Sequence, residues 1–208
     1  MKESVIFYGD SNTFGFNSAG YCDGGFRGTF FHRKDTWAGR LAASPLLAEM
    51  NVVNAGENGR MIPTAAWELR ELTDIVSRNA PVRLVGVMLG SNDLLTLYRC
   101  DMEKLSDRME GVLRHLLSLP EIAGEGGRLL LIAPTHTELP GYREEELEFN
   151  RLSEGFGETY RALAGKYGTH FADAGEWGIP LSSDGVHFTA EGHRIFAENL
   201  LRVLQAIL

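Results

Sequence analysis

Short apolar runs that end in polar turns recur along this chain, and they constrain its fold more than any other feature. They lie at residues 5–7, 52–55, 83–89, 128–134 and 170–173. Segments with helical spacing of apolar residues lie between most of them. Strands that alternate with helices predict a parallel sheet with helices on both faces. We therefore expect an α/β fold, a three-layer α/β/α sandwich around a five-stranded parallel sheet.

The intervening segments predict amphipathic helices with recognisable ends. Helices are expected from a cap at Asp35 or Thr36 to about residue 50 with a bend near Pro45, and at residues 63–80, 102–117, 144–167 and about 189–208. The run at 83–89 is almost continuously apolar, which is typical of a central strand covered on both faces.

Length and composition limit the possible classes of protein. The 208 residues, 44% of them hydrophobic, suffice for one domain over residues 1–208. The net charge of −8, from 20 basic and 28 acidic residues, argues against a nucleic-acid binder. No apolar run approaches the roughly 18 residues that span a bilayer. The first residues show no signal-peptide pattern, so we expect a cytoplasmic protein without a membrane partner.

The first polar turn, residues 8–15, carries the first candidate for chemistry. It reads Tyr-Gly-Asp-Ser-Asn-Thr-Phe-Gly and follows the first apolar run, so Ser11 is expected at the carboxyl edge of the sheet, where such folds bind ligands. The same turn suits two other roles. Its backbone N–H groups could hold a phosphate, as in a phosphate- or flavin-binding module, or it could be a plain turn braced by Asp10.

Three further polar positions extend this candidate site. A serine nucleophile needs a base, and an imidazole needs a carboxylate that fixes its tautomer. Asp184 and His187 lie three residues apart after the fifth predicted strand, so the carboxylate can reach Nδ1 and leave Nε2 for Ser11. Acyl transfer also needs donors for an oxyanion, and the second and third turns offer the Gly56 N–H and the Asn92 amide.

Alternatives for these residues stay open at this stage. Among the other five histidines, His136 also follows a strand and is the main rival of His187, whereas His193 lies inside the last helix. Asp10, Asp184 and His187 could instead bind a metal ion. Two thiols far apart in sequence, Cys22 and Cys100, predict neither a disulfide framework nor a metal cluster, and neither has a histidine beside it in sequence.

Together these blocks resemble the SGNH (GDSL-type) hydrolases in order and position. The blocks are Gly9-Asp10-Ser11, Gly56, Gly90-Ser91-Asn92-Asp93 and Asp184-Gly185-Val186-His187. The resemblance covers essentially the whole chain and implies a flavodoxin-like sheet and serine ester hydrolysis without metal or other cofactor. It implies that Ser11 is the nucleophile, His187 the base and Asp184 its partner. It also implies that Ser11, Gly56 and Asn92 form the oxyanion hole, and Asp10, Asn12, Asn58 and Asp93 support the site.

Within this family, the residues in and around these four blocks are most similar to the arylesterase/acyltransferase branch. That branch acts on small acyl esters and includes oligomers. The function expected from this resemblance is hydrolysis or transfer of small acyl groups, such as acetyl, with a small-molecule ester as partner. Carbohydrate deacetylase and thioesterase activities are the alternatives within the family. The Gly-rich aromatic loop at residues 16–35 is expected to be a lid or, in a homo-oligomer, a subunit contact, and a plain surface loop is the alternative.

Overall fold

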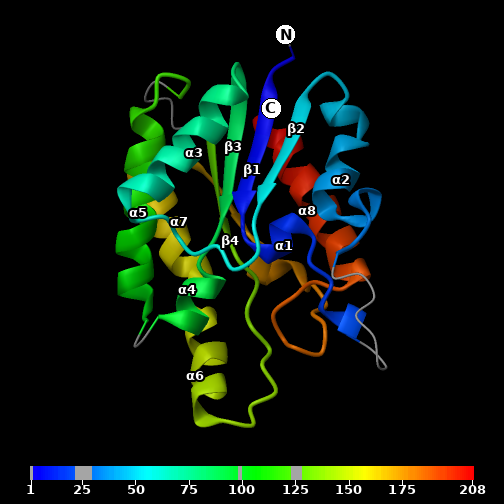
Figure 1. Ribbon diagram of the computed structural model, residues 1–208, viewed down its shortest axis with the longest axis vertical. Helices are drawn as coiled ribbons and strands as arrows, with labels where there is room; N and C mark the ends of the chain where they lie inside the picture. Colours follow the sequence, from blue (N-terminus) through cyan, green and yellow to red (C-terminus); the bar gives the residue numbers. More distant parts are fainter. Residues whose placement is uncertain (1, 22–29, 98–99, 123–127) are drawn as a thin grey trace.

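A single parallel sheet organises the protein. The computed structural model describes residues 2–21, 30–97, 100–122 and 128–208. Its five strands have the order β2-β1-β3-β4-β5, which is the doubly wound order of flavodoxin-like folds. All neighbouring pairs are parallel (Figure 1). The strands are β1 (Ser4–Gly9), β2 (Asn51–Gly56), β3 (Val82–Met88), β4 (Leu129–Ala133) and β5 (His170–Asp173). The predicted fold class is confirmed.

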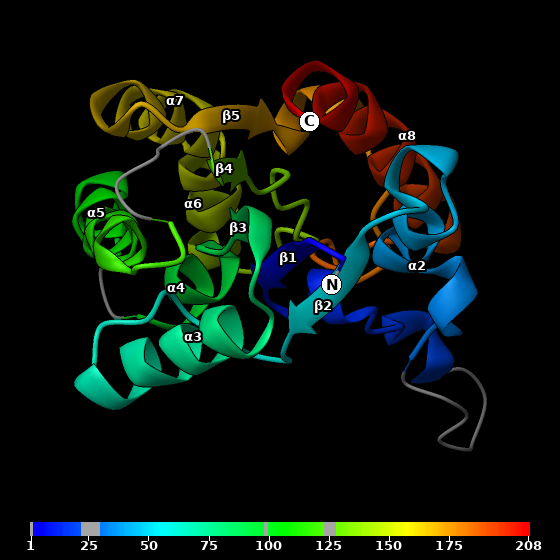
Figure 2. The same ribbon diagram turned by 90° about the horizontal axis from the view of Figure 1, so that it is seen from above.

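Helices cover both faces of the sheet. Figure 2 shows α3, α5 and α7 on one side and α2 and α8 on the other. The helices are α1 (Ser11–Phe14), α2 (Trp37–Ala42), α3 (Ala66–Arg78), α4 (Ser91–Thr96), α5 (Met102–Ser118), α6 (Glu144–Ser153), α7 (Phe156–Tyr167) and α8 (Ala190–Ile207). Among the described residues, no helix is long and apolar enough to cross a membrane.

The hydrophobic core has two parts because side chains alternate along each strand. On β1, Ile6 and Tyr8 point into the part beneath α3, α5 and α7, whereas Val5 and Phe7 point into the part beneath α2 and α8. β1 and β4 are buried along their whole length, and β3 along all but one residue. This explains why their sequences are continuous apolar runs instead of alternating ones.

Two predicted helices are divided or shorter in the structure, and two short helices were not predicted. The helix expected at 144–167 is divided into α6 and α7 at Gly155, which packs so closely on Met102 that a Cβ there would lie 2.7 Å from its Cγ. The helix expected to reach residue 50 ends at Ala42, and a separate 3₁₀ turn follows at Pro45–Leu47. The helices that were not predicted, α1 and α4, have only four and six residues and lie in predicted polar turns.

This topology brings the polar turns of the first three strands together. β1 lies between β2 and β3, and at its last residue Gly9 is level with Gly56 on one side and Met88 on the other. The segments that leave these three residues therefore start at the same edge of the sheet. β5 lies at the other end of the strand order. The loop between β5 and α8 runs back toward β1, because α8 packs against α2.

Candidate active site

Ser11 stands at the start of a one-turn helix directly after β1. The Asp10 side chain caps this helix by accepting a hydrogen bond from the Asn12 N–H at 3.0 Å. Gly15, with a φ of 99°, ends the helix after a single turn. A Cβ on Gly9 would collide with the Thr13 side chain, so only glycine allows this turn. The local sequence thus determines a sharp strand-to-helix turn with Ser11 at its apex.

His187 and Asp184 meet Ser11 in a continuous line of hydrogen bonds. The Ser11 hydroxyl lies 3.0 Å from His187 Nε2, and His187 Nδ1 lies 2.7 Å from Asp184 Oδ2. The other carboxylate oxygen of Asp184 accepts the backbone N–H groups of Val186 and His187 at 2.9 and 3.0 Å. The three-residue spacing therefore forms a tight turn in which the carboxylate bonds both the backbone and the ring of the histidine. The structure brings these three predicted residues together.

The pKa values of the two carboxylates near Ser11 are shifted in opposite directions. Burial alone would raise the pKa of Asp184, but the side-chain and backbone hydrogen bonds from His187 outweigh it and hold that pKa well below its usual value. Asp184 therefore stays ionised beside the imidazole. Burial raises the pKa of Asp10 to about 6, although the hydrogen bond from the Asn12 N–H opposes the shift. Asp10 braces the turn, and within the described part of the chain its carboxylate has no hydrogen bond to the Ser11 hydroxyl or the His187 ring.

Two of the three expected oxyanion donors are available in the structure. The Ser11 N–H has no hydrogen-bond acceptor among the described residues. Asn92 Nδ2 donates one hydrogen to the Arg60 carbonyl at 3.1 Å, which leaves its second hydrogen for a ligand. Both groups lie at the carboxyl edge, one after β1 and the other after the neighbouring strand β3.

Gly56 does not have the free N–H that its expected role as an oxyanion donor requires. Its N–H already donates to the Asn54 side-chain oxygen at 2.9 Å, and a Cβ at this position would lie 2.2 Å from the Phe14 nitrogen. Gly56 therefore lets β2 pack against α1, and its N–H is not free. Within the described residues, the N–H of Gly59 has no acceptor, and this glycine has a φ of 75° and open space around it. In the sequence, the feature that could have indicated Gly59 as a donor is its place in the polar turn Glu57-Asn58-Gly59-Arg60 after the second strand.

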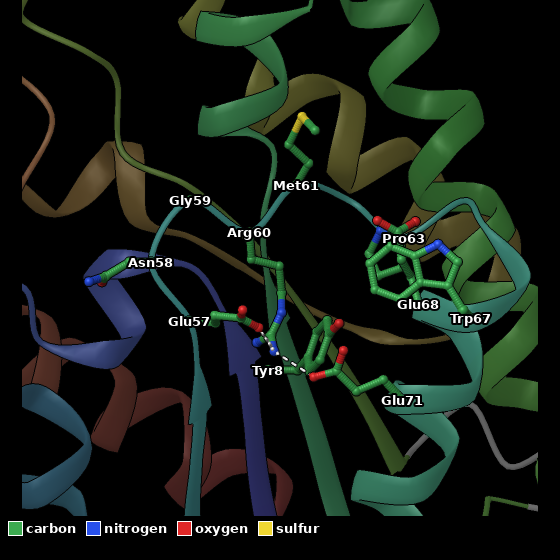
Figure 3. Close-up of a pocket in the computed structure, with 10 residues that line it drawn as sticks. All are labelled: Tyr8, Glu57, Asn58, Gly59, Arg60, Met61, Pro63, Trp67, Glu68 and Glu71. Atoms are coloured by element: carbon green, nitrogen blue, oxygen red, sulfur yellow. Dashed lines mark hydrogen bonds and ion pairs between the residues drawn. The ribbon is translucent and has the colours of Figure 1, made fainter.

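Arg60, which the sequence analysis did not single out, holds that turn in place. Its guanidinium donates to the Gly9 carbonyl at 3.0 Å and to the Ala55 carbonyl, and it pairs with Glu57 at 2.7 Å. It also stacks on the Tyr8 ring at 4.1 Å (Figure 3). Arg60 thereby joins the ends of β1 and β2, while its own carbonyl receives the Asn92 amide.

A small pocket opens beside Arg60. It holds about 200 Å³, and its walls include Tyr8, Trp67 and Glu71 (Figure 3). Asn58 and Gly59 of the turn after β2 also line this pocket. The pocket therefore lies along the turn that carries the Gly59 N–H.

Asp93 supports the site from beneath. It is fully buried, and its two carboxylate oxygens accept from Arg108 Nε at 2.7 Å and from the Ile62 N–H at 2.9 Å. Arg108 also donates to the Ile62 carbonyl at 2.8 Å. Asp93 therefore fixes the segment after Arg60 against α4, the helix that carries Asn92.

The other histidines that could have served as the base in place of His187 lie away from Ser11. His136 sits against Gly175 after β5. His193 is buried in the core, accepts the Trp37 N–H at 3.3 Å and packs against Phe188, and burial lowers its pKa to about 4. Within the described ranges, no group of three or more His, Cys, Asp or Glu side chains could hold a metal ion, so Asp10, Asp184 and His187 do not form such a set.

The described residues include one of the two thiols and the two ends of the aromatic loop. Cys100 is buried, which raises the pKa of its thiol, whereas Cys22 lies outside the described residues. Residues 22–29 of the loop at 16–35 also lie outside them. At the ends of this loop, Phe16 pairs with Phe30 in a β-bridge, and the Phe16 ring lies 4.6 Å from the His187 ring. The role of the loop as lid or subunit contact stays a prediction.

Comparison with known proteins identifies the family. The model of the GDSL-like Lipase/Acylhydrolase family matches residues 7–195. The chain belongs to this family. The GDSL-like acylhydrolase described here is 24% identical to the isoamyl acetate-hydrolyzing esterase of Saccharomyces cerevisiae, over 98% of this chain and 86% of the yeast protein.

Solved structures show the same fold. A carbohydrate acetylesterase family member from Sinorhizobium meliloti superposes with a TM-score of 0.80 at 25% identity, over 99% of each chain. The aryl esterase of M. smegmatis also has a TM-score of 0.80, at 23% identity, over 99% of this chain and 100% of that one. The GDSL-like chain is therefore an acylhydrolase whose homologues are esterases.

Proposed function

We propose that this protein is a serine esterase that removes small acyl groups, such as acetyl, from carboxylic esters through a covalent acyl-enzyme. The observation that carries the proposal is the hydrogen-bonded line from the Ser11 hydroxyl through His187 to Asp184, with distances of 3.0 and 2.7 Å. A hydroxyl, an imidazole and an ionised carboxylate in this order form the arrangement that activates a serine for attack on a carbonyl.

Acylation begins when Ser11 Oγ attacks the carbonyl carbon and His187 Nε2 takes the hydroxyl proton. Asp184 stabilises the resulting imidazolium and keeps Nδ1 protonated. The negative charge develops on the carbonyl oxygen, where we assign the Ser11 N–H, the Asn92 amide and the Gly59 N–H as donors. One such donor contributes about 3–4 kcal/mol to the transition state. When the tetrahedral intermediate collapses, the C–O bond to the alcohol breaks and His187 protonates the leaving oxygen.

Deacylation repeats these steps with water. His187 takes a proton from the water as its oxygen attacks the acyl carbon, and it returns that proton to Ser11 Oγ when the acid leaves. A second alcohol in place of water would give acyl transfer. The same residues serve both reactions, so the acceptor depends on which molecule reaches the acyl-enzyme.

The relatives support a small acyl group. The yeast relative is named for hydrolysis of isoamyl acetate, and a Sinorhizobium neighbour is named a carbohydrate acetylesterase. Carbohydrate deacetylation and thioester hydrolysis are the alternatives that use the same line of residues. A series of p-nitrophenyl esters of increasing chain length, with acetylated sugars and acyl thioesters alongside, separates the three. Turnover that falls steeply beyond short acyl chains supports the acetyl-ester assignment, and a preference for thioesters contradicts it.

Replacing Ser11 with alanine tests the nucleophile. We expect Ser11→Ala to lower p-nitrophenyl acetate turnover by more than roughly 10³-fold, because the covalent route is lost. Ser118→Ala, at an exposed position on α5, is the matched control and should leave turnover unchanged. A folded Ser11→Ala protein with normal turnover would contradict the proposal.

A phosphate- or flavin-binding role for the first turn is disfavoured by the position of Asp10. Its carboxylate already accepts the Asn12 N–H that a phosphate would need, and an anion at that place would face the Asp10 side chain. Calorimetric titration with inorganic phosphate and with flavin mononucleotide should show no binding at millimolar concentration. Saturable binding that Asp10→Asn strengthens would favour the module over the esterase.

A further inference from the structure

Asn12, the residue after Ser11, bridges the nucleophile helix and the loop that carries His187. Its Nδ2 donates to the Val186 carbonyl at 3.0 Å, and its Oδ1 accepts the Phe188 N–H at 2.9 Å. Val186 and Phe188 are the two neighbours of His187 in the chain. One side-chain amide thus bonds the backbone on both sides of His187, as a neighbouring β-strand would.

Asn12 is itself held in one position. Its side chain is buried, its own N–H donates to Asp10 at 3.0 Å and its carbonyl accepts from Trp37 Nε1 at 2.9 Å. With the two side-chain bonds, all four polar atoms of Asn12 have partners. A buried amide with every polar atom bonded is restricted to one rotamer, so it can transmit a fixed position from the Ser11 helix to the loop.

Most other hydrogen bonds of the loop fix its shape and do not connect it to the Ser11 side of the site. The Ser182 N–H donates to the His187 carbonyl at 2.7 Å, and the Glu138 N–H donates to the Gly185 carbonyl at 2.7 Å. Both bonds connect the loop to itself or to the segment after β4. On the side of the nucleophile, the Phe16 ring packs on His187 and the Ser18 hydroxyl meets Ser182. Ser18 also hydrogen-bonds Asp184, but neither Phe16 nor Ser18 bonds Val186 or Phe188, the two residues that Asn12 holds.

We propose that Asn12 is a positioning residue that sets the imidazole of His187 at hydrogen-bonding distance from Ser11. This inference rests on the proposed esterase function and adds to it the group that aligns base and nucleophile. Ser11 and His187 are 176 positions apart in the chain, so their 3.0 Å separation depends on contacts between two distant segments. A displacement of about 1 Å at a catalytic group can cost on the order of 10²-fold in rate.

Asn12→Leu removes both bonds with little change in size. We expect kcat for p-nitrophenyl acetate to fall about 10- to 100-fold while KM changes by less than about threefold, because alignment of the base matters mainly in the transition state. Val112→Ala, a buried substitution on α5 away from the site, lowers stability without touching the loop and should keep kcat. If Asn12→Leu does not fold, Asn12→Ala is measured in the same way.

A double-mutant cycle with His187→Ala distinguishes positioning from a general structural role. If Asn12 acts through the imidazole, Asn12→Leu should change the residual rate of His187→Ala by less than about twofold. A further fall as large as that in the wild-type background would overturn the inference, as would unchanged kcat in the single Asn12 variant. Ser11→Ala separates the two proposals: normal turnover in that variant contradicts the esterase mechanism itself.

Discussion

The stability of the protein should fall in mildly acidic solution because of one buried histidine. His193 is 0% exposed and lies between the Phe31 and Phe188 rings. Its Nδ1 accepts the Trp37 N–H, and its Nε2 has no hydrogen-bond partner among the described residues. Burial, followed by the charge of Arg40, lowers its pKa from 6.5 to about 4 in the folded protein. The neutral imidazole is therefore the form that fits the core.

The lowered pKa of His193 determines how the stability of the protein changes with pH. A histidine with a lowered folded pKa contributes stability above its unfolded pKa, and that contribution is lost as pH falls toward the folded value. For values of 6.5 and about 4, the loss relative to pH 7 is about 1 kcal/mol at pH 5.5 and about 2 kcal/mol at pH 4.5. That loss is a substantial part of the total stability of an ordinary domain.

Urea unfolding at pH 7, 5.5 and 4.5 measures this loss in the wild type and in His193→Gln. Glutamine stays neutral throughout and can still accept the Trp37 N–H. Whatever the substitution costs at pH 7, the free energy of unfolding should fall less with pH in the variant, by about 2 kcal/mol at pH 4.5. Asp10 and Asp184 titrate in both proteins, so their contributions cancel. An identical pH dependence in the two proteins would refute the reasoning.

Two further predictions concern residues around the site. Asp93→Asn should lower the free energy of unfolding by about 1–3 kcal/mol, measured in urea at pH 7, because one of the two buried oxygens that accept from Arg108 and from the Ile62 N–H becomes an amide donor facing another donor; a change within about 0.5 kcal/mol would contradict this role. Gly56→Ala should destabilise the protein by at least about 1–3 kcal/mol, since its Cβ would meet the Phe14 backbone, whereas Gly111→Ala, with open space in α5, should be neutral or stabilising. Equal thermal shifts in the two glycine variants would contradict the packing role of Gly56.

The strands and the catalytic candidates were accessible from the sequence because both depend on local patterns. Continuous apolar runs identify buried parallel strands, and the polar turns after them must lie at one edge of the sheet. The spacing of Asp184 and His187 likewise implies contact within one turn. The division between α6 and α7 was not accessible, because it depends on the close packing of Gly155 against Met102, two positions far apart in the chain.

The sequence by itself determined the α/β architecture, the sharp turn at Ser11 and the pairing of Asp184 with His187, since each depends on residues that are near one another in the chain. Only the tertiary structure places His187 beside Ser11 and His136 against Gly175, because both histidines follow strands in the sequence. It also showed that Asn54 takes the Gly56 N–H and that Asn12 bonds both neighbours of His187. The last of these contacts joins segments 174 and 176 positions apart, and no local pattern in the chain encodes it.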